Sequence, residues 1–127
     1  MIQPTPGQPT SQVPVLALGD VLLVSLQGEL HDGMAEQLQH DITTRISTSP
    51  VTGVVIDISG LDMVDSFLGR VLAEIASASR LLAARTVLAG MRPAVAITLV
   101  ELGLALPGLV TALDVDRAME LLSQRGS

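Results

Sequence analysis

The order of apolar runs and helix-like segments constrains the fold of this chain more than any other feature. Three short apolar runs, residues 54–58, 86–89 and 109–113, are each followed by a segment in which apolar residues recur at helical spacing. The helices predicted after these runs begin near Ser66, at Pro93, and at a cap formed by Asp114 or Asp116. Strands that alternate with helices in this way indicate a parallel sheet with right-handed crossovers.

The first part of the chain departs from this alternation. Residues 13–18 and 21–27 are two strand candidates joined across Gly19 and Asp20, a dipeptide typical of hairpin turns. A helix follows and runs to about Ser47; its apolar stripe is Met34, Ala35, Leu38, Ile42 and Ile46. The sequence therefore predicts one α/β domain over residues 13–127, with a mixed, mostly parallel sheet, an N-terminal β-hairpin and about four helices. Residues 1–12, rich in Pro, Gln and Thr, are predicted to be a flexible N-terminal tail.

Periodicity also predicts which side chains of the later helices face the core. The helix that begins near Ser66 is expected to bury the stripe Phe67, Val71, Ile75, Ala78 and Leu82, widened by Leu68 and Leu72. Gly103 is expected to close the helix that starts at Pro93. The last helix is expected to carry its apolar face on Ala118, Leu121 and Leu122.

Composition and charge exclude several classes of function. Thirteen acidic residues against seven arginines give a formal net charge of −6, which gives no electrostatic support to binding nucleic acid or anionic lipid. The chain has no cysteine, which excludes disulfides and thiolate chemistry and favours a reducing compartment, here the cytoplasm. The most apolar stretch, residues 93–113, is interrupted by charge, Gly and Pro, so neither half is long enough to cross a bilayer. The first residues lack the charged and apolar regions of a signal peptide.

Few residues are candidates for catalysis or metal binding. His31 and Asp32 could form an acid–base pair or simply a polar loop beside a helix start, and no nucleophile lies near them in the sequence. His40 falls on the predicted solvent face of its helix. Carboxylates near the end of the strand at residues 54–58 could bind Mg²⁺ or form a solvated acidic loop; they are Asp57, Asp62 and Asp65. We predict no catalytic residue, no metal site and no cofactor.

Ser66 lies where the acidic loop becomes an apolar helix, and the sequence leaves two roles open for it. Its hydroxyl could cap the helix by accepting a backbone N–H, an interaction worth about 1 kcal/mol. Alternatively, Ser66 could be phosphorylated, because a phosphate at a helix start meets unpaired N–H groups and the positive end of the helix dipole. Asp62 and Asp65 would repel that phosphate. Because the helix start favours an anion, phosphorylation need not unfold the domain, and it would change the surface that a partner contacts.

The segment IDISGLDMVDSFLGRVL, residues 56–72, resembles the signature of STAS domains. In that signature a buried strand leads through a short loop to an Asp-Ser pair that opens a helix, and the predicted order of elements from about Val13 onward is also similar. Within the family, VDSFLGRVLAEI, GMRPAVAITLVELGL and the early ELHD most resemble the RsbS group, the small single-domain scaffold proteins of the bacterial stressosome. Single-domain anti-sigma-factor antagonists usually continue the Asp-Ser pair with a small hydroxyl residue and Gly, where this chain has Phe67 and Leu68.

The resemblance implies a signalling function without catalysis. Proteins of the RsbS group assemble with sensor-bearing STAS paralogues and capture a serine kinase, which leaves after it phosphorylates the scaffold; a phosphatase resets the system. By this resemblance Ser66 is the phosphoacceptor, Asp65 is its neighbour in the motif, and ATP and Mg²⁺ belong to the kinase. Asp62, Asp65 and Phe67 are the candidate residues for partner binding. We also expect homo- and hetero-oligomers, with no nucleic acid or membrane as partner.

Two other functions and one structural question stay open at this point. An anti-sigma-factor antagonist controlled by the same serine is the alternative, and a small hydrolase that uses His31 and Asp32 is a third hypothesis. Phe67 is the single aromatic residue of the chain. It could belong to the core stripe of its helix or could serve as a partner-facing anchor, since aromatic residues are enriched at binding hot spots.

Overall fold

A computed structural model describes residues 13–28, 30, 32–61, 63–103 and 109–124. The elements within these residues are β1 (Val15–Leu18), β2 (Val21–Gln27), α1 (Asp32–Thr48), β3 (Gly53–Gly60), α2 (Ser66–Leu81), β4 (Arg85–Ala89), α3 (Pro93–Glu101), β5 (Leu109–Ala112) and α4 (Val115–Ser123). Each lies within about two residues of its predicted position. The predicted flexible tail, residues 1–12, lies outside the described residues.

The five strands form one sheet in the order β1-β2-β3-β4-β5. β1 and β2 pair as an antiparallel hairpin across Gly19, whose φ of +64° suits a residue without a side chain. β2, β3, β4 and β5 then pair in parallel. The predicted α/β class, the N-terminal hairpin and the mostly parallel sheet are therefore confirmed.

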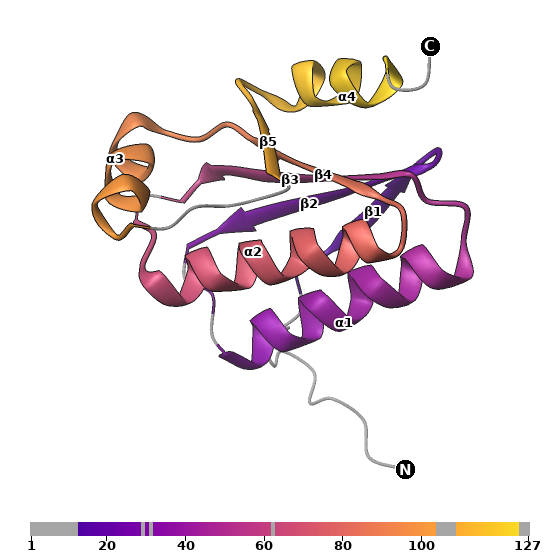
Figure 1. Cartoon of the computed structure of the whole chain (residues 1–127), viewed down its shortest axis with the longest axis horizontal. Helices are drawn as coiled ribbons and strands as arrows, with labels where there is room; N and C mark the ends of the chain where they lie inside the picture. Colours follow the sequence, from indigo (N-terminus) through magenta and orange to yellow (C-terminus); the bar gives the residue numbers. More distant parts are fainter. Residues whose placement is uncertain (1–12, 29, 31, 62, 104–108, 125–127) are drawn as a thin grey trace, which may run out of the picture.

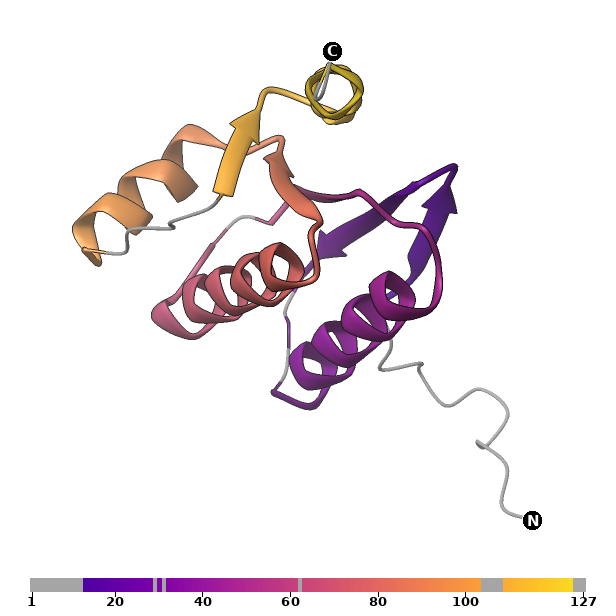
Figure 2. The ribbon, with the colours of Figure 1, turned by 45° about the vertical axis from the view of Figure 1, so that its right-hand side comes forward.

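The helices cover the two faces of the sheet unequally. Figures 1 and 2 show α1 and α2 lying side by side on one face, with α4 on the opposite face. Both views place α3 on the other side of α2 from α1, and its Val95 and Leu99 join the same buried cluster as α1 and α2. One face of the sheet is thus covered by three helices and the other by α4 alone.

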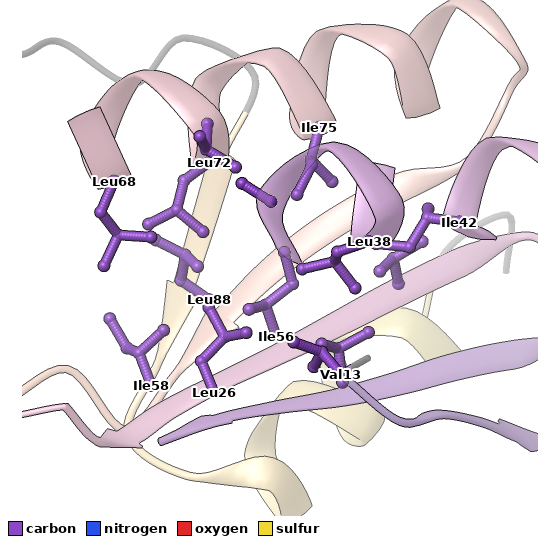
Figure 3. Close-up of a cluster of buried hydrophobic side chains, with 14 of the residues drawn as sticks. Val13, Leu26, Leu38, Ile42, Ile56, Ile58, Leu68, Leu72, Ile75 and Leu88 are labelled. Atoms are coloured by element: carbon purple, nitrogen blue, oxygen red, sulfur yellow. The ribbon is translucent and has the colours of Figure 1, made fainter. Parts of the chain in front are cut away.

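β3 is buried on both faces, and so is its neighbour β4. Val54, Ile56 and Ile58 point into the larger cluster beneath α1 and α2, where Figure 3 shows Ile56 and Ile58 among side chains from the neighbouring strands and helices. Val55 points to the smaller cluster, which it shares with Ala118 and Leu122 of α4. Because both faces are covered, Val54, Val55 and Ile56 are apolar in succession rather than alternating with polar residues, and Asp57 after them is half-buried.

The buried face of α2 differs in part from the predicted stripe. Its buried residues are Leu68, Gly69, Val71, Leu72, Ile75, Ala76 and Ser79. Phe67 and Ala78 are only half-buried, and Leu82 is 41% exposed as the residue that ends the helix. The stripe prediction was therefore wrong at its edges, because α2 packs against both the sheet and α1 and turns the row between these two neighbours inward.

The remaining helices follow their predictions closely. Pro93 is the first residue of α3, and Gly103 follows its last turn with a φ of +68°. Of the two candidate caps for α4 the structure uses Asp114, whose carboxylate accepts the Arg117 N–H at 2.8 Å. Leu121, expected on the buried face of α4, is half-buried. Among the described residues, none of the helices combines the length and hydropathy that a membrane span requires.

We predict that Gly53→Ala destabilises the domain because a Cβ at this position would lie 2.7 Å from Cδ1 of Leu122. Leu122 is one of the two buried residues of α4, with Ala118, that pack against the sheet, so the clash forces α4 or the Leu122 side chain to shift. Overpacking of this kind lowers the free energy of unfolding by about 1 to 3 kcal/mol, which urea denaturation measures.

Gly33→Ala in the first turn of α1 is the matched control. A Cβ there meets nothing within 4 Å, so alanine is expected to stabilise the helix by about 0.5 to 1 kcal/mol. Equal effects of the two substitutions would contradict the proposed contact between Gly53 and Leu122.

Candidate functional site

The loop between β3 and α2 is held to the core while its middle faces solvent. Leu61 and Val64 are 1% and 6% exposed, and the Leu61 N–H donates to the carbonyl of Ile58 at 3.1 Å. Met63 between them is 83% exposed. The loop therefore places the start of α2 near the carboxyl end of β3, and the buried side chains of Leu61 and Val64 fix this position.

Asp65, not Ser66, caps α2. The backbone of Asp65 is extended, with φ −105° and ψ −179°, and its carboxylate accepts the Leu68 N–H at 2.9 Å. Its carbonyl accepts the Gly69 N–H at 3.0 Å, which is the first hydrogen bond of the helix. The interpretation of Ser66 as the cap was wrong, because Ser66 is already the first helical residue and a cap must lie outside the helix.

The hydroxyl of Ser66 is consequently not used to cap the helix. Ser66 is exposed, and its side chain forms no hydrogen bond with any residue that the structure describes. Of the first-turn amides, Leu68 and Gly69 donate to Asp65, so the amides of Ser66 and Phe67 are the ones without a partner among the described residues. An anion attached to Ser66 would meet these amides at the positive end of the α2 dipole.

Phe67 lies at the boundary between the core and the surface. Its ring is half-buried and packs against the larger core cluster. The same residue lines a shallow pocket of about 180 Å³ between α1 and α2, whose charged residues are Asp32, Glu36, Arg70 and Glu74. The two roles left open by the sequence are therefore compatible, since Phe67 both packs against the core and borders a surface pocket.

The acidic residues that could have bound Mg²⁺ have separate roles where the structure describes them. Asp57 accepts the Ser59 N–H at 3.0 Å and lines a different pocket, with Gly90 and Asp114. Asp65 is engaged in the cap. Asp62 lies outside the described residues, and the described ones contain no group of three or more side chains that could hold a metal ion.

Of the two histidines, only His40 lies within the described residues. His31 lies outside the described residues, so its pairing with Asp32 stays untested. Asp32 itself is exposed at the first position of α1 and borders the pocket next to Phe67. His40 is exposed on α1, as predicted.

The pocket between α1 and α2 was missed in the sequence, although a signal for it was present. Asp32 and Glu36 are four residues apart, and so are Arg70 and Glu74, which places each pair on one face of its helix. The sequence shows these two charged faces separately. It does not show that α1 and α2 pack side by side and bring the faces together around Phe67.

Comparison with known proteins relates this chain to STAS-domain proteins in both sequence and fold. Residues 12–117 match the family model of the STAS domain. A serine-to-glutamate variant of RsbS from Moorella thermoacetica is 40% identical, with a TM-score of 0.78 over 87% of this chain and 94% of that one. A chain in a structure described as the molecular architecture of the stressosome, a signal integration and transduction hub, is 42% identical, with a TM-score of 0.76 over 87% of this chain and 96% of its own.

Curated relatives are longer than this chain. The RsbT co-antagonist protein RsbRC of Bacillus subtilis is 31% identical over 97 residues, which cover 76% of this chain and 34% of the relative. RsbRD and RsbRA of the same organism match in the same way. The chain thus spans about a third of the length of the curated relatives that it matches, between 34% and 38%.

We predict that Asp65→Ala and Ser66→Ala have different effects on stability. Asp65→Ala removes the acceptor of the Leu68 N–H and should lower the free energy of unfolding by about 1 kcal/mol. Ser66→Ala removes an exposed hydroxyl without a described partner and should change it by less than about 0.5 kcal/mol. Chemical denaturation of both variants makes the comparison, with Asp65→Asn as the variant that keeps the cap. If Ser66→Ala lowered the free energy of unfolding more than Asp65→Ala does, Ser66 rather than Asp65 would be the capping residue.

Proposed function

This chain belongs to the STAS-domain family, and from that premise we propose that it is a non-catalytic stressosome scaffold that holds a serine kinase and releases it when Ser66 is phosphorylated. The observation that carries the proposal is the exposed hydroxyl of Ser66 at the start of α2, which has no hydrogen-bond partner among the described residues. The likeness to RsbS and to a stressosome chain, at 40% and 42% identity, supports the assembly in which it would act.

The proposed partners follow from the same likeness. The relatives named RsbT co-antagonist proteins support an RsbR-type, sensor-bearing paralogue as the assembly partner, and their name points to an RsbT-type protein as the kinase. A phosphatase would restore the unmodified serine. Homo- and hetero-oligomers are both part of the proposal, because a scaffold of this kind acts as an assembly.

In the proposed reaction this chain supplies only the accepting oxygen. Phosphoryl transfer requires a base or positioning group for the hydroxyl and a metal that neutralises the phosphates. The described residues around Ser66 offer neither a histidine nor a metal-binding cluster, so the proposal assigns the base, ATP and Mg²⁺ to the kinase. What this chain contributes is position, because Asp65 fixes the start of the helix and leaves the neighbouring hydroxyl exposed.

Electrostatics explains how phosphorylation would release the kinase. A phosphate adds a charge of about −1.5 to −2 at pH 7. It would stand next to the exposed carboxylate of Asp65, on a chain whose formal net charge is already −6. A docked surface that fits a neutral hydroxyl would then have to desolvate and face this anion, which weakens binding by about 2 to 4 kcal/mol.

The residues proposed to contact the kinase flank the phosphoacceptor. Asp65 is exposed on one side of Ser66, and Phe67 borders the α1–α2 pocket on the other. Asp62 stays a proposed contact on sequence grounds, since it lies outside the described residues. Asp62, Asp65 and Phe67 would together form a small surface around Ser66.

We predict that the cognate kinase and ATP modify Ser66 and dissociate, whereas Ser66→Ala keeps the kinase bound. Mass spectrometry maps the modified residue, and the dissociation constant of the kinase should rise about 30-fold to 1000-fold on phosphorylation. Ser77→Ala, which removes an exposed serine farther along α2, is the matched control and should behave as wild type. Modification at another residue, or release of the kinase from Ser66→Ala, would contradict the proposal.

The alternative function, an anti-sigma-factor antagonist, differs in its assembly. A stressosome scaffold mixed with an RsbR-type paralogue should form a very large particle in analytical ultracentrifugation. A monomer or dimer that instead displaces a sigma factor from its inhibitor would favour the antagonist.

We also predict that Phe67→Leu weakens kinase binding more than it destabilises the fold. Leucine keeps most of the apolar volume that packs against the core, so the free energy of unfolding should fall by less than about 1.5 kcal/mol. The loss of an aromatic contact at a docking surface should raise the dissociation constant of the unphosphorylated complex about tenfold. Unchanged affinity, measured by calorimetry, would restrict Phe67 to a structural role.

A further inference from the structure

Helix α3 is apolar on both sides but packs against the domain on only one. Val95 and Leu99 are 1% and 5% exposed and belong to the larger core cluster. On the opposite side, Ile97 and Val100 are 59% and 78% exposed. A helix that is apolar all round is normally buried all round, so the core of this domain accounts for only half of the apolar character of α3.

The exposed side forms a continuous surface, which we call the α3 outer face. Its residues recur at a spacing of three or four and share one side of the helix; they are Pro93, Ala94, Ile97, Val100 and Glu101. All five are exposed. Figures 1 and 2 both show α3 at the margin of the molecule, on the other side of α2 from α1, where a second protein could reach it.

The two ends of α3 carry complementary electrostatic features. The N-cap position is Arg92, and its side chain makes no capping hydrogen bond, so the first turn lacks a side-chain acceptor for its N–H groups. At the other end Glu101 is the last helical residue and the last turn has no basic residue. An acidic residue is unfavourable at the negative end of its own helix dipole and favourable near the positive end of another.

We propose that the α3 outer face is the surface through which two copies of this chain associate, with their α3 helices antiparallel across a two-fold axis near Ile97. Ile97 lies four residues from Pro93 and four from Glu101, so the two-fold axis brings Glu101 of each copy to the start of the other α3. The apolar centre and the opposite charges at the two ends are thus self-complementary, as a two-fold contact requires.

The side chains of the outer face fit such a contact. Ala94 and Pro93 are small enough to let two helices approach to an axial distance of about 8 to 10 Å, while Ile97 and Val100 fill the space between them. Arg92 already has an interaction within the chain, and its guanidinium has enough N–H groups to donate to a second carboxylate as well. Self-association is already part of the proposed scaffold function, on which this inference rests; the contact assigns it to one surface, which does not involve Ser66.

The first test is Val100→Glu in the full chain, which places a charge at the apolar centre of the contact. Sedimentation equilibrium should show that the dissociation constant of self-association rises at least about tenfold. Leu81→Glu is the matched control, because Leu81 is 87% exposed at the end of α2 and should leave self-association unchanged. Circular dichroism melting checks that both variants fold, and Val100→Ala, which removes apolar area without adding charge, should weaken association by a smaller factor.

A charge exchange then tests the antiparallel arrangement. Glu101→Arg and Arg92→Glu should each weaken self-association, and the double variant should restore it toward the wild-type value. A double variant no better than the single ones would overturn the arrangement. Wild-type chain that stays monomeric at all concentrations, or equal effects of Val100→Glu and Leu81→Glu, would overturn the self-contact itself.

The remaining outcomes separate this proposal from the phosphorylation switch. If Val100→Glu leaves self-association intact but blocks assembly with the sensor-bearing paralogue, the occupant of the outer face is the paralogue and the proposed second copy is wrong. Kinase release on phosphorylation of Ser66 should be the same in Val100→Glu and wild type. Either proposal can therefore fail while the other stands.

Discussion

The burial of β3 on both faces is the constraint on which the rest of this structure depends. Ile56 and Ile58 require a layer of helices on one side, and Val55 requires α4 on the other. A strand covered on both faces is typical of the interior of a parallel sheet, and β3 lies between β2 and β4 and is parallel to both. Its carboxyl end then sets where the loop before α2 emerges, and with it the position of Ser66.

The division of tasks between Asp65 and Ser66 is what makes the start of α2 suitable for a reversible modification. The carboxylate of Asp65 satisfies the helix, so the serine beside it is not needed for structure. With the two tasks on separate side chains, the charge of the surface can change while the helix start is preserved.

The apolar surplus of this chain is distributed unevenly over its surface. Most of the buried aliphatic side chains lie on the side of the sheet that three helices cover. Ile97 and Val100 of α3 are nevertheless exposed next to this side. A chain of the same fold acting alone would gain solubility from polar residues at these positions. Their apolar character is consistent with a domain whose neighbours are other proteins, in line with its likeness to a stressosome chain.

The sequence alone determined the class of fold, the hairpin, the order of strands and helices, and the place where α2 begins, because these depend on local propensity and on the period of apolar residues. It also marked Ser66 and Phe67, through the Asp-Ser pair and the presence of a single aromatic residue. Only the tertiary structure decided that Asp65 is the cap, since capping depends on the backbone angles that the preceding loop imposes. In the same way, periodicity gives each helix an apolar row but not the neighbour that the row meets. The packing of α2 between the sheet and α1, the half-buried ring of Phe67 and the uncovered face of α3 therefore followed only from how the elements pack together.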